Sequence, residues 1–307
     1  MNIYLPIAEM SQNVLVLLAV GGFVGVLTGI FGVGGGFLLT PFLIFLGIPA
    51  PIAVASAANQ VLGSSVSGVI GHWRRDGVDV KMGLVLLVGG ITGSSTGVWL
   101  FGLLRQVGHV DLVISICYVA LLGGIGSMML WESVGAVRRR RGSAGSRTAR
   151  GARRYPWLNA LPLKMRFRKS RLFISPILPA GVGFFVGLLS AIMGVGGGFI
   201  MVPAMIYLIG MPSQVVIGTS LFQIIFVAAN VVFLQSVTLQ TVDVVLAVML
   251  LVGGVVGAQY GVRIGARMAS EQIRVFLALL VLSVGAVMLY GLLAKPADLY
   301  TVTRLVD

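Results

Sequence analysis

The hexapeptide Gly-Val-Gly-Gly-Gly-Phe occurs twice in this 307-residue chain, at residues 32–37 and again 162 residues later at residues 194–199. Each copy lies in a long apolar run and is soon followed by a proline, Pro41 or Pro203. Glycine costs about 1 kcal/mol relative to alanine inside a helix, so four glycines within five positions break a helix. At membrane depth, such irregular backbone survives only where protein buries it or where it lines a cavity. The two copies therefore predict two broken helices inside a membrane.

The composition excludes a soluble globular domain. Hydrophobic residues make up 57% of the chain and charged residues 10%, whereas a soluble domain carries roughly 25% charged residues. The first apolar run has no Lys or Arg before it, which favours a retained membrane segment over a cleaved signal peptide. A single cysteine, Cys117, excludes an intrachain disulfide. We therefore expect an all-α polytopic membrane protein.

The net charge of +13 comes from one connecting segment. Residues 138–171 hold 13 Lys or Arg and no acidic residue, while the rest of the chain carries 9 basic and 9 acidic residues. A basic segment between two hydrophobic halves is typical of a cytoplasmic loop that follows the positive-inside rule. It predicts contact with anionic lipid of the bilayer rather than with nucleic acid.

The two halves match beyond the hexapeptide. Pro203 matches Pro41, Gln223 matches Gln60, and glycines four residues apart recur near the end of each half. After each break comes a short apolar piece of about ten residues, against about 20 for a full span, which predicts a half-helix. We interpret residues 1–137 and 172–307 as two homologous transmembrane repeats joined by a basic cytoplasmic linker, residues 138–171. Paired repeats with broken helices are typical of transporters.

The direction of the repeats depends on the short pieces. If each crosses the membrane, the halves are inverted; if each turns back, the halves are parallel. Inversion places the loop that contains Arg263, Arg267 and Arg274 on the cytoplasmic side, and the positive-inside rule favours that arrangement.

The expected chemistry is that of an anion site without a fixed charge. No charged residue lies between Met10 and His72, or from Leu172 to Val242. N–H groups at the start of a helix lack intrahelical partners and attract anions, and we expect the glycines to supply positive φ and close backbone approach. The predicted substrate-binding residues are Gly34, Gly35, Gly36, Ser56, Asn59, Gln60, Gly196, Gly197, Gly198, Thr219, Ser220 and Gln223. The alternative for all of them is helix packing, because small and amide-bearing residues often join transmembrane helices.

Other chemistries find little support in the sequence. Phe37 stands where the GxGxxG fingerprint needs its last glycine, and nothing resembles a metal cluster or a catalytic triad. We expect no enzyme activity, no cofactor and no metal. Asp111 and Asp243 lie near predicted segment ends at the membrane interface, so a proton relay through carboxylates is not expected.

The paired GVGGGF breaks, the proline after each, the small polar segments and the basic central loop resemble the sulfite exporter family, TauE/SafE. The resemblance covers both halves, and the linker is longer and more basic than the family pattern. It implies a multi-pass transporter of sulfite or related organosulfur anions in the bacterial inner membrane. An alternative from another class is a membrane scaffold whose Arg-rich loop recruits a partner. The sequence does not decide whether the protein forms a homodimer.

Overall fold

The computed structural model describes residues 2–31, 35–73, 77–108, 110–142, 165–167, 169–170, 172–265 and 270–293. Most of the predicted linker and one predicted site residue, Gly34, therefore lie outside the described residues. Arg267, from the loop used to orient the repeats, also lies outside them.

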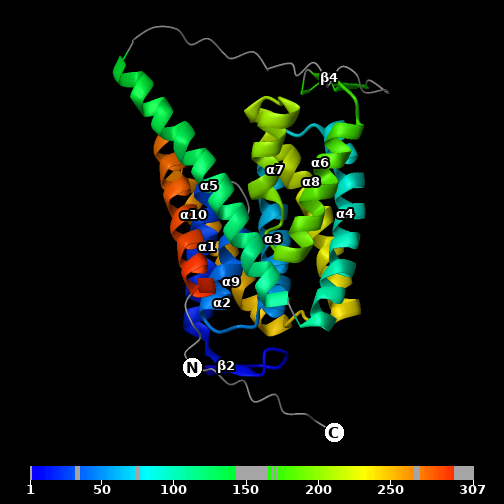
Figure 1. The fold of residues 1–307 in the computed structure, drawn as a ribbon, viewed down its shortest axis with the longest axis vertical. Helices are drawn as coiled ribbons and strands as arrows, with labels where there is room; N and C mark the ends of the chain where they lie inside the picture. Colours follow the sequence, from blue (N-terminus) through cyan, green and yellow to red (C-terminus); the bar gives the residue numbers. More distant parts are fainter. Residues whose placement is uncertain are drawn as a thin grey trace.

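The first half begins with a short hairpin and continues as helices (Figure 1). Its elements are β1 (Asn2–Leu5), β2 (Met10–Asn13), α1 (Val14–Phe31), α2 (Gly36–Phe45), α3 (Ala50–Trp73), α4 (Val80–Val107) and α5 (Val110–Gly142). Asp79 caps the start of α4 by accepting a hydrogen bond from the Met82 N–H at 3.2 Å. Gly108 ends α4 in the left-handed conformation, with φ 76°.

The second half has the same order of elements. They are β3 (Met165–Phe167), β4 (Leu172–Ile174), α6 (Ile177–Met193), α7 (Gly198–Ala204), the π-helical turn η2 (Met205–Ile209), α8 (Ser213–Leu234), the π-helical turn η3 (Gln235–Leu239), α9 (Val244–Gly265) and α10 (Ser270–Leu293). The second short piece thus changes from α-helix to π-helix after Pro203, whereas α2 stays α-helical.

Two features differ from the sequence-based expectation. The chain carries an antiparallel hairpin before each half, β1–β2 and β3–β4, which an all-α prediction did not include. In addition, α5 continues to Gly142, through the start of the segment assigned to the linker. Strong apolar runs identify membrane helices, but they carry no signal for short polar hairpins at their ends.

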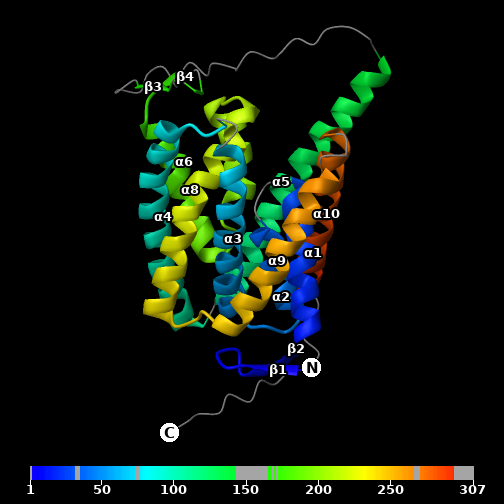
Figure 2. The same cartoon turned by 180° about the vertical axis from the view of Figure 1, so that it is seen from behind.

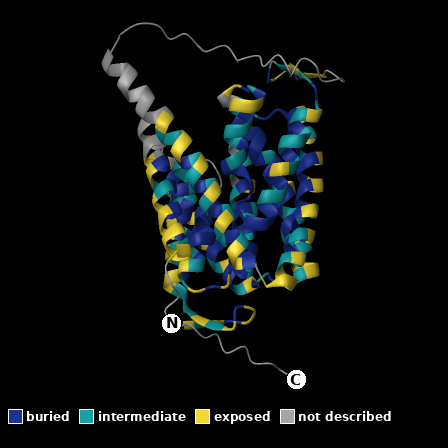
Figure 3. Ribbon diagram, viewed as in Figure 1, coloured by how far each residue is buried: buried dark blue, intermediate teal, exposed yellow. Residues whose placement is uncertain are grey.

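Five of the described helices are long and apolar enough to cross a membrane. They cover Val80–Val107, Val110–Trp131, Val215–Leu239, Val244–Gly261 and Phe276–Leu293. The helix α3 is not among them because serines and amides interrupt its apolar run, yet most of its residues as far as Val61 are buried. Exposed residues lie mainly on the outer surfaces of the bundle and buried residues inside it (Figure 3). The chain is a helical, multi-pass membrane protein.

Glycine stripes bring the two halves together, as their four-residue spacing predicts. The closest helix pairs are α1 with α9 and α4 with α6. A Cβ built on Gly25 would lie 2.3 Å from the Gly254 carbonyl oxygen, and one on Gly93 would lie 2.0 Å from the Phe184 oxygen. Only glycine allows such close backbone approach, so the stripes act as packing surfaces.

The hairpins β1–β2 and β3–β4 lie at opposite ends of the bundle (Figures 1 and 2). Each helix pairing is reciprocal: the first helix of one half packs on the fourth helix of the other, and α5 packs on α10. The end of α9 and the start of α10 lie at the same end as the C-terminal end of α5 (Figure 1). This arrangement is the one expected if the two halves are inverted repeats.

Candidate functional site

The second break separates α6 from α7 by four residues, Gly194 to Gly197. Gly194, Gly196 and Gly197 have φ of 69°, 72° and 77°, which is the left-handed region. Side chains with a Cβ rarely adopt this conformation, so these three positions require glycine. The Gly194 N–H donates to the Ser190 carbonyl at 2.9 Å and ends α6, and Gly198 then begins α7.

The first break is built differently in its described part. Gly35 precedes α2 with φ −77°, and neither Gly35 nor Gly36 has a positive φ. The expectation of left-handed glycines is therefore wrong for these two residues. These positions need glycine because there is no room for a side chain. A Cβ on Gly35 would lie 2.1 Å from Thr28 Oγ1. The Thr28 hydroxyl is held there because it donates to the Val24 carbonyl at 2.8 Å.

The two breaks touch one another. A Cβ on Gly36 would lie 2.5 Å from the Gly194 carbonyl oxygen, and the rings of Phe37 and Phe199 stack with centroids 4.5 Å apart. Val61 of α3 lies against both breaks, since a Cβ on Gly36 or on Gly196 would meet one of its methyl groups within 2.6 Å. The described part of the first hexapeptide, residues 35–37, and the second hexapeptide thus meet in one junction next to α3.

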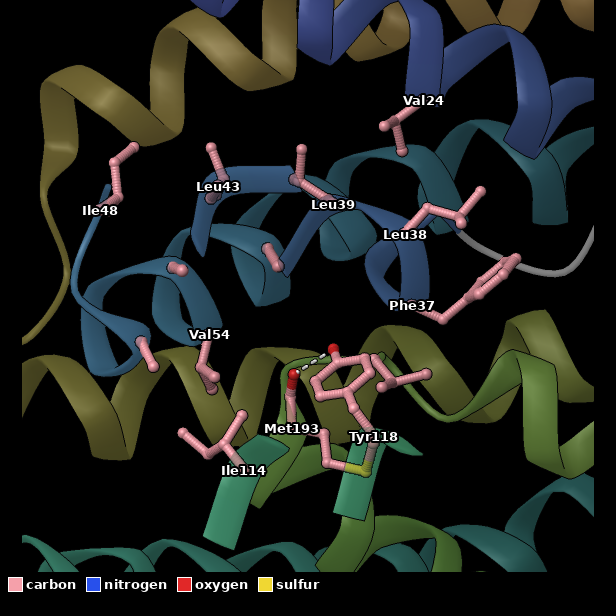
Figure 4. Close-up of a cluster of buried hydrophobic side chains, with 14 of the residues drawn as sticks. Val24, Phe37, Leu38, Leu39, Leu43, Ile48, Val54, Ile114, Tyr118 and Met193 are labelled. Atoms are coloured by element: carbon pink, nitrogen blue, oxygen red, sulfur yellow. Dashed lines mark hydrogen bonds between the residues drawn. The ribbon is translucent and has the colours of Figure 1, made fainter. Parts of the chain in front are cut away.

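Two buried hydroxyls fix the second break, and the sequence analysis missed both. Tyr118 of α5 donates to the Met193 carbonyl at 2.7 Å (Figure 4). Thr40 of α2 donates to the same oxygen at 3.2 Å. Met193 is the last residue of α6, so its carbonyl lacks the usual intrahelical partner. A lone tyrosine in an apolar run was the only available signal.

Gln60 and Gln223 occupy corresponding places. Each is ten residues into its helix, α3 or α8, which is about 15 Å from the helix start. The two helices pack on each other and run in opposite directions, so both amides lie near the middle of the bundle. Their exposed fractions are 2% and 1%.

Each glutamine faces a glycine of the other half. A Cβ on Gly254 of α9 would lie 2.4 Å from Gln60 Nε2, and one on Gly90 of α4 would lie 2.5 Å from Gln223 Nε2. In the described part of the chain, neither Gln60 Oε1 nor Gln223 Oε1 has a hydrogen-bond partner. Buried polar atoms without partners are uncommon, and each calls for a physical explanation.

The remaining predicted site residues divide into two groups. Ser56 lies one turn before Gln60, fully buried, and its hydroxyl has no partner among the described residues. The Asn59 amide and the Ser220 hydroxyl donate to carbonyls of their own helices at 2.9 Å, so they are already satisfied. The Thr219 hydroxyl, in the second turn of α8 and one turn before Gln223, accepts a hydrogen bond from the Asp79 N–H at 2.9 Å.

Two buried carboxylates tie the hairpins to the bundle, and we name them the Asp79 and Asp243 clasps. Asp79 Oδ2 accepts from the N–H and the hydroxyl of Ser170, at 3.0 and 2.6 Å. Asp243, completely buried before α9, accepts from the Leu246 N–H and from the Ile7 N–H, both at 3.1 Å. Each clasp joins the fourth helix of one half to the hairpin before the first helix of the other.

The clasps bear on two sequence-based expectations. Asp111 and Asp243 were expected near segment ends, and they lie in the first turn of α5 and directly before α9. Asp79 was not singled out, although it does the same work as Asp243. Among described residues, the carboxylates of these two clasps are the buried charged groups, and both lie at helix starts rather than at mid-depth.

No described group of three or more His, Cys, Asp or Glu is arranged to hold a metal ion.

Comparison with known proteins places this arrangement in a family. The family model described as "Sulfite exporter TauE/SafE" matches residues 17–288. "Probable membrane transporter protein YjnA" of Bacillus subtilis (strain 168) is 28% identical over 281 residues, which cover 90% of this chain and 98% of the relative. YunE of the same organism, also named a probable membrane transporter protein, is 23% identical, with 91% and 98% covered.

A third relative, "Probable membrane transporter protein" of Xylella fastidiosa (strain 9a5c), is 28% identical over 85% of this chain and 88% of its own length. No solved structure matches the chain. The family match spans both helix breaks, both glutamines and every described transmembrane helix as far as Met288. The chain therefore belongs to the TauE/SafE sulfite exporter family of membrane transporters.

Proposed function

We propose that this transporter carries sulfite or a closely related small organosulfur anion across the bacterial inner membrane. In this proposal the anion binds where the two helix breaks meet α3 and α8. The observation that supports it best is that Val61, the neighbour of the buried Gln60 in α3, lies against both breaks, and that the matching Gln223 of α8 is buried as well.

The described residues at the junction offer an anion neutral donors, and no carboxylate lies among them. The first turns of α2 and α7 begin at Gly36 and Gly198, and helix starts present N–H groups and the positive end of the helix dipole. The Ser56 hydroxyl and the two glutamine amides add side-chain donors. Hydrogen bonds to an ionised group are about twice as strong as bonds between neutral groups. Neutral donors also release the anion more readily than a fixed cation would.

The junction also has the geometry that a transporter needs. The breaks belong to opposite halves of the chain. These halves meet where α1 packs on α9 and α4 packs on α6 through closely spaced glycines. Substrate sites of repeat-built transporters lie at such junctions, formed by discontinuous helices. We place the segment 138–171 on the cytoplasmic side because of its charge.

Anion flux into proteoliposomes tests the proposal. Purified protein would be compared with protein-free liposomes for sulfite, sulfate, thiosulfate, sulfoacetate and taurine. We expect protein-dependent flux of sulfite or of an organosulfonate, above that of sulfate. Flux of none of these anions from folded, correctly inserted protein would contradict the proposal.

A further inference from the structure

Each of the two buried glutamines has an amide oxygen that receives no hydrogen bond from the described residues. The Nε2 side of each amide faces a glycine of the opposite half, Gly254 or Gly90, while the Oε1 atom stays without a partner in the described part of the chain. The same pattern occurs in both halves at corresponding positions. What distinguishes these two glutamines from Gln235, whose Oε1 is also without a partner among the described residues, is that each lies against a glycine of the opposite half.

A simple anion does not resolve this deficit. A sulfonate or sulfate group is an acceptor, so it pairs with N–H and O–H groups but leaves both glutamine carbonyl oxygens unpaired. The nearby hydroxyl of Ser56 is also without a partner and has a proton of its own to offer the anion. The atoms that stay unsatisfied around an acceptor-only anion are thus Gln60 Oε1 and Gln223 Oε1.

We propose that the site selects anions that carry their own hydrogen-bond donor, bound by Gln60 Oε1 or Gln223 Oε1. This inference rests on the proposed function and narrows its substrate class. An O–H or N–H group on the substrate pairs with a glutamine oxygen while the acidic group binds the neutral donors. Hydrogen sulfite, hydroxyalkanesulfonates and aminoalkanesulfonates fit this description, and a plain alkanesulfonate does not.

Polar sites discriminate strongly against a substrate that lacks the matching group. A site built to hydrogen-bond a substrate rejects the analogue without that group because buried polar atoms are then left unpaired. One such unpaired atom changes affinity by roughly 5- to 150-fold. We expect the specificity constant, kcat/KM, to differ by at least about tenfold between donor-bearing and donor-free substrates.

Three sulfonates provide a matched test. Ethanesulfonate, 2-hydroxyethanesulfonate and taurine share the sulfonate and the two-carbon chain, and they differ only in the terminal hydrogen, hydroxyl or ammonium group. Initial rates would be measured in proteoliposomes with wild-type protein. We expect both substituted sulfonates to exceed ethanesulfonate about tenfold or more in kcat/KM, and a preference for only one of them would identify which donor the site accepts.

Variants at the glutamines connect the preference to the residues. In Gln60→Leu and Gln223→Leu the preference should fall, and in the double variant it should disappear, because kcat/KM for the two substituted sulfonates falls by a larger factor than kcat/KM for ethanesulfonate. Gln235→Leu is the control. Its amide is also buried with an unpartnered Oε1, but it lies three turns further along from Gln223 and its Nε2 donates to the Ala191 carbonyl at 3.2 Å. The control should keep the wild-type preference.

The possible results distinguish a failure of the donor preference from a failure of the proposed transport function. Equal kcat/KM for ethanesulfonate and both substituted sulfonates in the wild-type protein would overturn the inference and leave the transport function standing. So would glutamine variants that lower all three rates by the same factor. Absence of flux for the three sulfonates and for sulfite would overturn the proposed function, and the inference with it. The wild-type comparison stands even if a variant fails to fold.

Discussion

Replacing Gly254 by alanine should displace the Gln60 amide without unfolding the protein. The new Cβ would lie 2.4 Å from Gln60 Nε2 and 3.1 Å from its Cδ and Cγ, so the contact falls on the far end of a flexible side chain. Moving that side chain off its rotamer costs about 0.5–1.5 kcal/mol. Alanine stabilises a helix interior by about 1 kcal/mol relative to glycine. The two effects nearly cancel in the free energy of unfolding.

The effect on transport should be much larger. A lost hydrogen bond to a charged ligand is worth about 1.5–3 kcal/mol, which corresponds to a rise in KM of roughly 10- to 100-fold. The assay is the KM for sulfite in proteoliposomes, with the unfolding temperature as the measure of stability. Gly123→Ala is the control because a Cβ at Gly123 meets nothing within 4 Å.

A double variant sharpens this prediction. If Gly254→Ala acts only through the amide, the pair Gly254→Ala with Gln60→Leu should behave like Gln60→Leu alone, because the two changes act on one interaction. A Gly254→Ala protein that folds normally and keeps the wild-type KM would refute the role that we assign to Gln60. So would additive effects of the two substitutions.

Three further predictions concern the frame around the site. Asp79→Ala and Asp243→Ala should each lower the free energy of unfolding by about 1–3 kcal/mol, because each removes a helix cap and a charged hydrogen bond to a hairpin. Chemical denaturation measures this change. An unchanged denaturation midpoint would contradict the stabilising role that we assign to the clasps. Gly257→Ala should abolish the monodisperse folded protein on size exclusion, since its Cβ would lie 2.1 Å from a backbone oxygen of α1 that cannot move aside. Normal elution of this variant would disprove the close packing of α1 on α9. Cysteines placed at Glu9 and at Met165, in a background without the native cysteine, should label from opposite sides of the membrane; labelling from one side would rule out the inverted arrangement.

The features that were predictable from sequence are those with a local pattern. Close helix contact admits only glycine, so stripes such as Gly89, Gly93 and Gly97 reveal a packing face whatever the partner helix is. Four glycines in five residues interrupt a helix wherever they occur. The sequence match of Gln60 and Gln223 predicted equivalent positions, and each lies ten residues into its helix.

The features that were missed depend on distant partners. The Asp79 clasp needs Ser170, and the Tyr118 hydroxyl needs the Met193 carbonyl, 75 residues away in the chain. Backbone groups carry no side-chain signature, so their pairing with a distant residue is invisible until the fold brings them together. The same reason explains Gly35, whose need for glycine comes from the hydroxyl of Thr28 and not from its own φ.

Equilibrium binding of radiolabelled sulfite to the purified protein tests most directly whether the two halves form a single site. We expect one sulfite bound per chain, with Gln60→Leu and Gln223→Leu each weakening the same binding event by a similar factor and the double variant abolishing it at accessible concentrations. Two independent sites per chain, or folded variants that bind sulfite as tightly as the wild-type protein, would contradict the account.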